Sequence, residues 1–493
     1  MKRYLRIGAV LLLFLTVASL REALAGPPYL SFSTDSNGRV FYVQPPYLPE
    51  RVIDNAGVAG ESEEEAALTV SLNSPEDLFV DSRDHLYIVD TANNRVLHLD
   101  DRDRIVKTVG EEEGGGQLNG PQGIYVDDSQ TMYVADTKNK RIAVFDAEGR
   151  FVREYEKPSS PYLPDSYGFE PTKIAVDGRG MMYVATRNGI YGLMLMDSKK
   201  GEFHGFFGPN RTPYNFVDDL KRRFFTKDQL AKELKKLPGS ITNLSIDSDG
   251  FIYTTSVDLK RGQLKKLNYA GQDLLGDRKY GDRSARIGEE SLFVDLAVDR
   301  FGNISAIDAR TGRVYQHDAE GNLIFAFGSK DEGYNKMGLV IYPSSIAVDS
   351  SGSIYVLDKL ANAIQVFRPT AFGDLVHKAS MLYSNGQYEE SEKLWSEVLH
   401  LNSKYYRAHL GLAKSYYKKE QWKAAMAEFK KARDVTGYSN AYWHVRMIWL
   451  QKHFNTIATS LLALAAGWYA ATLLQRRIRK KGGRMFGNDH RSI

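Results

Sequence analysis

Ile124-Tyr-Val-Asp127, followed after a short turn by Met132-Tyr-Val-Ala-Asp136, is the phrase that decides the fold of this 493-residue chain. It consists of an apolar strand that ends in aspartate, a turn, and a second apolar strand that usually contains tyrosine. Five more copies of the phrase begin at Leu78, Ile174, Leu244, Leu296 and Ile346. Self-similarity of this kind is the signature of a repeat architecture.

The repeat has the length of a propeller blade. Its first aspartates are Asp81, Asp127, Asp177, Asp247, Asp299 and Asp349, which lie 46, 50, 70, 52 and 50 residues apart. Units continue into a third strand, as in Arg141-Ile-Ala-Val-Phe145, and often a fourth, as in Phe151-Val-Arg-Glu-Tyr155. Four short antiparallel strands per repeat are typical of β-propellers. We therefore predict an all-β, six-bladed β-propeller over residues 30–369.

The second repeat resembles the NHL-repeat family, whose blades read like Gly120-Pro-Gln-Gly-Ile-Tyr-Val-Asp127 and Asn139-Lys-Arg-Ile142. The likeness is strong in the first, second and sixth blades and weaker in the other three. It implies a propeller and, by itself, no activity. Because an open ring would expose sheet edges, we expect the early strand Arg39-Val-Phe-Tyr-Val43 to supply the outer strand of the last blade.

Two sets of repeated polar residues are expected to be structural. The six aspartates end their strands just before turns, where aspartate typically bonds its own backbone; a ring of metal-binding carboxylates is the alternative. The second set is Asp90, Asn93 and Arg95, with Asp136, Asn139 and Arg141 as its equivalent in the next repeat. We expect these residues to tie adjacent strands together at hairpin turns.

Candidate ligand-binding residues lie four positions before each repeated aspartate, at the expected mouth of the central channel. They are Asp77, Gly123, Lys173, Asn243, Asp295 and Ser345, with Glu76 and Gln122 one position earlier. The acids and the amide offer oxygen ligands of the kind that Ca²⁺ accepts. The positive charge of Lys173 would weaken the binding of a cation at this site, because like charges repel even at an effective dielectric constant of about 20. We therefore expect Lys173 to pair with Asp77 or Asp295, and we predict no cofactor.

The same set resembles that of the gluconolactonase and senescence-marker family, six-bladed lactone hydrolases with a central divalent metal. The resemblance implies that Glu76 or Asp77 corresponds to the family's first acidic ligand. Asn243 then corresponds to an asparagine ligand, and Asp295 corresponds to the aspartate ligand. Asp77, Asn243 and Asp295 are then the metal ligands of an alternative, lactonase-like function that uses Ca²⁺ or another divalent cation. The sequence departs from the family at Lys173, because the metal site would need another neutral ligand at this position. We assign no catalytic residue.

Helical periodicity replaces strand periodicity after Pro369. Small and aromatic residues recur at a spacing of 34, pairing Ala379 with Ala413, Ser391 with Ala425, Trp395 with Phe429, and Val398 with Ala432. This order resembles the tetratricopeptide repeat, a helical hairpin. We predict a helical domain over residues 373–453, which serves either as a protein-binding groove or as a plain spacer. A second helical segment is expected over residues 213–237, inside the propeller.

The two ends of the chain predict export and membrane anchoring. Residues 1–25 have the basic start, apolar run and small residues of a cleaved signal peptide, with an uncleaved anchor as the alternative. Residues 454–474 carry no charge and are long enough to cross a bilayer. The basic tail, residues 475–493, is expected in the cytoplasm. These features predict a single-pass protein of the plasma membrane, with its N-terminal domains outside the cell.

Composition narrows the choice of partners. The chain contains no cysteine, which excludes disulfides and thiolate metal sites. Residues 26–453 carry a net charge of −5, so nucleic acid is not an expected partner. With two interaction modules and no complete catalytic set, we predict a binding or scaffold protein. Its expected ligand is a carbohydrate, a cell-wall polymer or another membrane protein, such as a sugar transporter that it assists.

Overall fold

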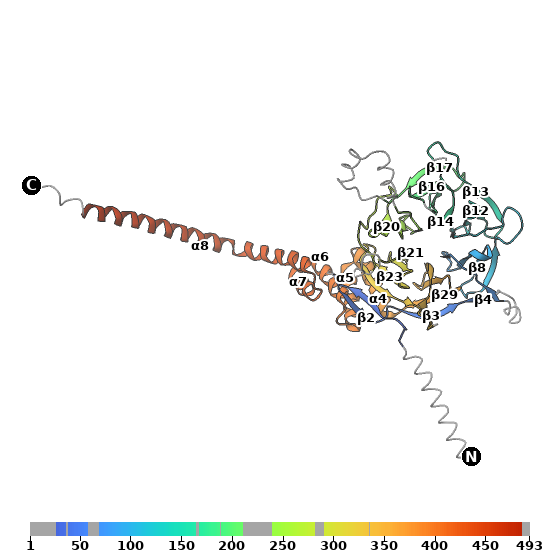
Figure 1. Cartoon of the computed structure of the whole chain (residues 1–493). Coiled ribbons are helices and arrows are strands. Elements are labelled where there is room, and N and C mark those ends of the chain that lie inside the picture. Colours follow the sequence, from blue (N-terminus) through green and yellow to red (C-terminus); the bar gives the residue numbers. More distant parts are fainter. Residues whose placement is uncertain are drawn as a thin grey trace, which may run out of the picture. The chain divides into compact units, whose positions relative to one another are not determined.

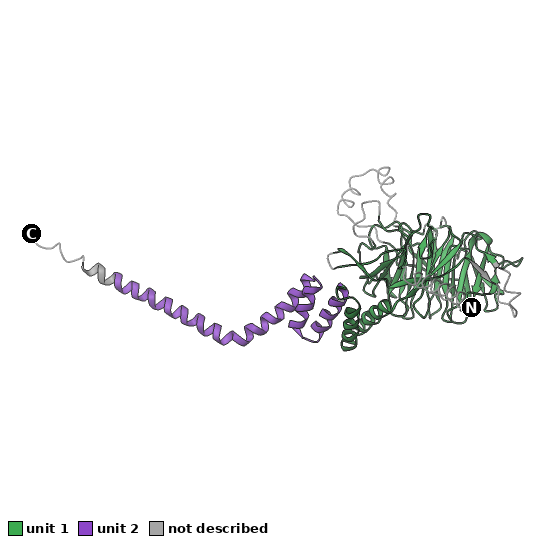
Figure 2. Ribbon diagram, turned by 90° about the horizontal axis from the view of Figure 1, so that it is seen from below, with its two compact units in different colours: residues 1–405 green, residues 406–493 purple. Residues whose placement is uncertain are grey.

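The computed structural model describes residues 26–35, 38–57, 69–163, 167–187, 189–210, 239–281, 290–334 and 336–485. They belong to two compact units, Met1–Tyr405 and Tyr406–Ile493 (Figure 2). The first unit contains six antiparallel sheets arranged as a ring (Figure 1). The predicted six-bladed propeller is therefore confirmed.

Each blade begins with its innermost strand. Blade 1 consists of β6 (Asp77–Val80), β7 (Leu86–Asp90), β8 (Arg95–Leu99) and β9 (Ile105–Val109). Blade 2 consists of β10 (Gly123–Val126), β11 (Met132–Asp136), β12 (Arg141–Phe145) and β13 (Phe151–Tyr155). Blade 3 consists of β14 (Pro171–Val176), β15 (Met181–Thr186), β16 (Leu193–Asp197) and β17 (Phe203–Phe207).

The remaining blades are less regular. Blade 4 has three strands in the described residues, β18 (Asn243–Ile246), β19 (Ile252–Thr255) and β20 (Leu264–Leu267). Blade 5 consists of β21 (Phe293–Val298), β22 (Ile304–Asp308), β23 (Arg313–His317) and β24 (Leu323–Phe327), extended by β1 (Ser31–Thr34) and β2 (Val40–Val43). Blade 6 consists of β27 (Pro343–Val348), β28 (Ile354–Asp358), β29 (Ala363–Pro369) and β3 (Tyr47–Ile53). Two small pairs complete the list, β4 (Asn55–Gly57) with β5 (Thr69–Ser71), and β25 (Ser329–Lys330) with β26 (Leu339–Val340).

The ring is closed by a different strand from the one that the sequence suggested. The outer strand of blade 6 is β3, which runs antiparallel to β29 with Ile53 opposite Ile364 (Figure 1). The expected strand, residues 39–43, instead forms β2 at the free edge of blade 5. The reason lies in burial: both ends of β3 are buried, whereas β2 has no buried residue.

The repeated aspartates have the predicted structural role. In each of the first five, the Oδ1 atom accepts the backbone N–H groups two and four residues later, at 2.8–3.0 Å. Asp349 accepts the N–H of Ser353 in the same way. At the hairpin turns, Asp90 accepts bonds from Asn93 and Arg95, and Asp136 repeats this arrangement with Asn139 and Arg141. Both predictions are confirmed.

A helix covers the closure between blades 5 and 6. The helix α4 (Ala371–Ser384) is capped at its N-terminus by Thr370. The hydroxyl of Thr370 accepts the N–H of Gly373 and donates to the carbonyl of Pro45. Gly373 is required here, because a Cβ atom at this position would lie 2.4 Å from the carbonyl oxygen of Pro46. The next helix of this unit is α5 (Tyr388–Leu401).

A buried polar network joins α4 to the propeller. His377 is fully buried, and burial lowers its pKa to about 3, so its imidazole is neutral. Its Nε2–H therefore donates to Oε1 of Gln316, at 2.6 Å. The Nε2 atom of Gln316 in turn donates to the hydroxyl of Tyr47, at 3.1 Å. Tyr47 also stacks on Phe327, with ring centroids 4.6 Å apart.

The second unit consists of α6 (Tyr406–Lys418), α7 (Trp422–Lys431) and α8 (Val435–Met485). Its core includes Ala413, Ala425 and Phe429, three of the positions that the spacing of 34 identified. The corresponding positions of the first helical pair, Ala379, Ser391 and Trp395, are also buried. The assignment of these hairpins to the tetratricopeptide repeat stays a prediction, as do the predicted domain boundaries.

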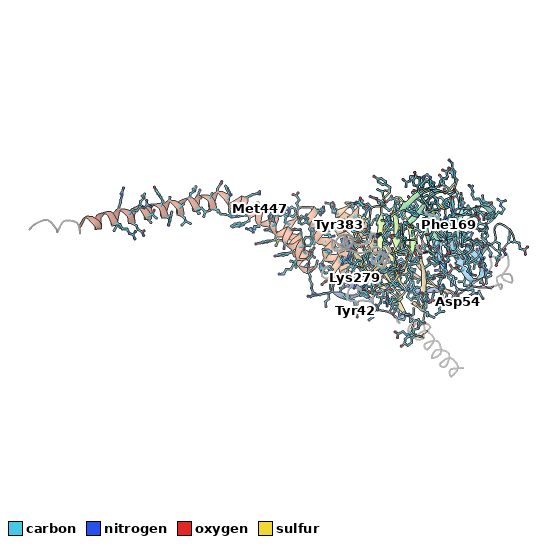
Figure 3. All side chains as sticks on the ribbon, turned by 45° about the horizontal axis from the view of Figure 1, so that its top comes forward. Tyr42, Asp54, Phe169, Lys279, Tyr383 and Met447 are labelled. Carbon is cyan, nitrogen blue, oxygen red and sulfur yellow. The ribbon has the colours of Figure 1, made fainter. Side chains whose placement is uncertain are left out.

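The helix α8 is the one candidate for membrane insertion in the described chain. Its 51 residues span about 76 Å at 1.5 Å per residue. The segment Val435–Arg479 has a mean hydropathy of 1.6 in its most apolar part, none of which is buried. Side chains project from both sides of α8 beyond Met447 (Figure 3). The helix contains the predicted span, residues 454–474, and is consistent with single-pass anchoring.

Three predictions concern residues outside the described part of the chain. They are the signal peptide (residues 1–25), the helical insertion (residues 213–237) and the end of the basic tail (residues 486–493).

Truncating Tyr47 should open the ring closure. Tyr47→Ala removes a ring that is 1% exposed and leaves a cavity beside Phe327, so we expect it to lower the free energy of unfolding by about 3–5 kcal/mol. The matched variant Tyr47→Phe keeps the ring and should cost about 1 kcal/mol, because Gln316 retains Ser305 as an acceptor. Urea unfolding of the detergent-solubilised chain measures both. Equal losses in the two variants would contradict this role of the ring.

Candidate functional site

Five of the predicted site residues meet at one level of the central channel. Asp77, Lys173, Asn243, Asp295 and Ser345 each lie at or near the start of the innermost strand of a different blade. Asp77, Asn243, Asp295 and Ser345 are 0–5% exposed, and the side chain of Lys173 is 12% exposed. We call these five residues the polar ring. They form a buried layer across the channel, and their role in ligand binding stays a prediction.

The polar ring connects neighbouring blades through backbone amides. Ser345 of blade 6 accepts the N–H of Leu78 in blade 1, at 3.1 Å. Asp77 of blade 1 accepts the N–H of Ile124 in blade 2, at 3.0 Å. Asp295 of blade 5 accepts the N–H of Ile346 in blade 6, at 2.9 Å. These three bonds link blades 5, 6, 1 and 2 in an unbroken series.

Lys173 extends the series to blade 3. Its Nζ atom forms an ion pair with Oδ1 of Asp77, one of the two partners that the sequence suggested. Gly123 leaves the space for this contact, because a Cβ atom there would lie 2.3 Å from the carbonyl oxygen of Thr172 and 3.1 Å from the side chain of Lys173. Asp77 is buried and the Lys173 side chain is only 12% exposed, so the two charges are paired, as buried charges generally must be.

Asp295 is the residue of the polar ring for which a raised pKa follows from its surroundings. Burial raises its pKa to about 7; the negative charge of Asp77 adds to this effect, and the positive charge of Lys173 opposes it. Its Oδ2 atom lies 2.6 Å from Oγ of Ser345, which is also 3.1 Å from Oδ1 of Asp77. A serine hydroxyl carries one proton. Both contacts are therefore hydrogen bonds at the same time only when one of the two carboxyl groups is protonated, and the raised pKa of Asp295 favours that residue.

Asn243 differs from the other members of the polar ring. Its Oδ1 atom accepts the N–H of Leu244 at 2.7 Å, which fixes the orientation of the amide. Its Nδ2 atom is buried and has no hydrogen-bond acceptor in the described part of the protein. A buried donor of this kind costs about 1–3 kcal/mol. Asn243 thus lines the cavity, and its Nδ2 donor is covered and has no partner among the described residues.

The polar ring forms one end of a cavity of about 430 Å³. Asp77, Lys173, Asn243 and Asp295 line this end. The side walls are the innermost strands, and the exposed surface of the cavity is more polar than apolar. Turn residues that follow the repeated aspartates line the other end, namely Ser82, Asp128, Gly178 and Ser248. The sequence reasoning missed this second end, although each of these residues directly follows a repeated aspartate.

Two predicted site residues lie outside the polar ring. Glu76 forms an ion pair with Lys359, and Gln122 accepts a hydrogen bond from Arg187 at 3.0 Å. Neither residue lines the cavity. The physical reason is the alternation of side chains along a strand, which directs residue 76 away from the side that residue 77 occupies.

The donor set does not fit a divalent metal. Oδ1 of Asp77 pairs with Lys173, and Oδ2 accepts a backbone N–H. Both oxygens of Asp295 also accept backbone N–H groups. A cation held by Asp77 would lie next to the Lys173 ammonium, and each unit of charge at 4 Å costs about 4 kcal/mol at an effective dielectric constant near 20. Among the described residues, no three His, Asp or Glu side chains are grouped to hold a metal ion.

Comparisons with known proteins agree with the fold. Residues 118–145, which cover most of blade 2, match the NHL repeat family. The search of curated proteins found no match. Similar solved structures include a streptogramin B lyase, which is 11% identical, with coverage of 70% of this chain and 94% of that chain and a TM-score of 0.41.

Two further structures show the same degree of likeness. The Cps50 (Swd1) β-propeller domain of Myceliophteria thermophila is 11% identical, covering 62% of this chain and 99% of that chain, with a TM-score of 0.40. A structural genomics protein of unknown function from Bacteroides thetaiotaomicron is 14% identical, with coverage of 69% of this chain and 90% of that chain and a TM-score of 0.41. Likeness at this level carries no argument about function.

Replacing Asp295 with asparagine should change how stability depends on pH. The folded chain keeps a proton on Asp295 up to about pH 7, whereas an unfolded aspartate loses it near pH 4. Between these values the folded state binds more protons, so this group makes wild-type stability fall as pH rises, by up to about 1.4 kcal/mol per pH unit. Asp295→Asn cannot ionise. The stability of the variant relative to wild type should rise from pH 4 to 7 and level off above.

Urea unfolding at half-unit pH steps measures this difference. Asp277→Asn removes a carboxyl group whose side chain is 76% exposed and controls for the loss of one surface charge. A relative stability of Asp295→Asn that stays flat across the window would show that Asp295 is already ionised in the folded chain.

Proposed function

We propose that this chain is a membrane-anchored, extracytoplasmic binding protein that presents its propeller to a ligand. The observation that carries the proposal is the polar ring at the end of the cavity. Its acids already bond lysine, serine and backbone groups, and its unused group is the amide donor of Asn243. This arrangement suits recognition, because the polar groups are held in position by bonds to the protein and include no free nucleophile. The proposal includes neither a metal nor nucleic acid.

The anchoring part of the proposal rests on α8 and its flanks. The uncharged residues 454–474 are followed by Arg476, Arg477, Arg479, Lys480, Lys481 and Arg484. Basic residues at the end of a span favour the cytoplasmic side. The apolar start of the chain, residues 7–20, supports export of the part in between. The chain then crosses the plasma membrane once, with the propeller outside the cell.

The helical pairs support a second recognition role. Small residues at their contacts, such as Ala413 and Ala425, allow close approach of the helices, as in tetratricopeptide hairpins that bind protein segments. Together with the propeller they make a scaffold for a carbohydrate or cell-wall ligand and for a neighbouring membrane protein. A sugar transporter is the kind of partner that such a scaffold would assist.

Single-cysteine labelling tests the orientation, because the chain contains no cysteine of its own. Tyr269 is 81% exposed, so Tyr269→Cys should react with a membrane-impermeant maleimide on intact cells. Ser492→Cys, in the basic tail, should react only after the cells are opened. The reverse pattern would place the propeller in the cytosol and overturn the proposal.

Affinity capture tests the binding role. The full chain, tagged at its C-terminus and extracted in detergent, should retain a specific membrane protein after cross-linking in intact cells. The matched control lacks residues 26–369 but keeps the helices, the span and the tail. Loss of the partner from the control assigns recognition to the propeller. Identical captures from both chains would remove the propeller from the proposed function.

A further inference from the structure

We propose that the first part of α8 carries a lipid-binding surface, which lies in the headgroup layer of an anionic phospholipid membrane. The surface consists of exposed side chains of α8 between Tyr442 and Phe454, and we call it the aromatic arc. This inference rests on the membrane anchoring in the proposed function and deepens it, because it assigns lipid contacts to residues outside the span.

The aromatic arc faces away from the helices that pack against α8. On the packed side, Ala441 belongs to the core of the second unit, and His444 stacks on Trp422 of α7 with ring centroids 3.9 Å apart. On the other side, four large side chains are 50–66% exposed: Tyr442, Trp443, Trp449 and Phe454. At about 100° per residue they fall within about 140° of the helix circumference, together with Arg446 and Leu450.

The composition of the aromatic arc fits a membrane interface. Tyrosine and tryptophan are enriched there, because each joins an apolar ring to a polar O–H or N–H group. Arg446 adds a positive charge within the arc, and Lys452 lies beside it. Residues 435–474 contain these two basic residues and no aspartate or glutamate. The charge of the arc therefore complements the phosphate groups of anionic lipids.

The aromatic arc is continuous with the candidate span. It ends at Phe454, the first residue of the uncharged segment 454–474, and Trp449 lies about 7.5 Å before Phe454 along the helix axis. Insertion of the span therefore brings this end of the arc to the headgroups. Lipid is the surface that α8 itself supplies to the arc.

The length of the aromatic arc indicates how it lies. From Tyr442 to Phe454, twelve steps of about 1.5 Å cover about 18 Å. The headgroup layer on each side of the hydrocarbon core is thinner, about 5–8 Å. The whole arc contacts this layer only if the first part of α8 lies along the membrane surface.

A bend at the start of the span allows this orientation. The hydroxyl of Thr459 donates to the carbonyl of Asn455 at 2.8 Å, and the hydroxyl of Ser460 donates to the carbonyl of Thr456 at 2.7 Å. Hydroxyl bonds of this kind often bend helices, and α8 changes direction part of the way along its length (Figure 2). These residues directly follow the arc, so the helix turns there from the surface into the bilayer.

Spin labels on single cysteines test the inference. Leu450→Cys places the label in the aromatic arc, and Ile448→Cys places it about 160° away around the helix. Leu464→Cys places it in the span. The full chain is reconstituted in vesicles of phosphatidylcholine and phosphatidylglycerol. EPR power saturation then compares collisions of each label with oxygen, which concentrates in lipid, and with a water-soluble nickel chelate.

We expect the oxygen-to-nickel ratio to report lipid on one side of α8. The ratio should be higher by about threefold or more at residue 450 than at residue 448, as for an interfacial helix, and highest at residue 464. In vesicles of phosphatidylcholine alone, the ratio at residue 450 should fall, because Arg446 and Lys452 lose their anionic partners.

Removing one aromatic ring tests the arc itself. With the label at residue 450, Trp449→Ser should lower the oxygen-to-nickel ratio, because serine has no ring to hold in the interface. The matched control is Ile448→Ser: Ile448 is 53% exposed and Trp449 is 54% exposed, but Ile448 lies outside the arc. The control should leave the ratio unchanged.

Three results would overturn the inference. Equal ratios at residues 450 and 448 would leave the aromatic arc in water. A label at residue 450 that neither reagent reaches would show that a protein surface, such as a second copy of α8, covers the arc. An unchanged ratio without phosphatidylglycerol would remove the role of anionic lipid. The label at residue 464 separates these failures from a failure of the proposed anchoring, because it reports whether the span lies in lipid.

Discussion

The structure depends on satisfying the inner edges of six innermost strands. Each of these strands bonds its blade on one side and faces the channel on the other, where no further strand can pair with it. A buried amide without an acceptor is costly. Ser345, Asp77 and Asp295 solve this problem by accepting amides of the neighbouring blade. The polar ring is therefore first a device that joins blades.

Ring closure is the second constraint, and it joins residues that are distant in the sequence. Tyr47 near the start of the propeller packs on Phe327 and bonds Gln316, and β3 completes the sheet of blade 6. Because the entropic cost of closing a loop grows only slowly with its length, one sheet edge and one aromatic cluster can hold a contact across some 300 residues. Docking of α4 through His377 adds a neutral group that bonds Gln316 to the same junction.

The sequence predicted what repeats and missed what occurs once. The turn aspartates, the Asp-Asn-Arg clusters and the polar ring recur at equivalent positions of the repeats. The role of one copy therefore predicts the role of the others. The closing strand has no second copy. Pro49 interrupts the pattern of β3, yet an outermost strand tolerates proline, and this position lies opposite Phe367. Period-two alternation could have separated Glu76 from Asp77. The contact between Ser345 and Asp295 could not be foreseen, because it joins different blades.

The hydrogen bonds of the polar ring also bear on the choice between binding and catalysis. A general base needs a lone pair that can reach a substrate proton. In Asp77 and Asp295 each carboxyl oxygen holds a lysine, a serine or a backbone amide, so moving a proton at either acid disturbs the contacts between blades. The unused group, the amide of Asn243, donates but does not titrate. Because these acids hold the blades together, the arrangement supports the proposed recognition role over a catalytic one.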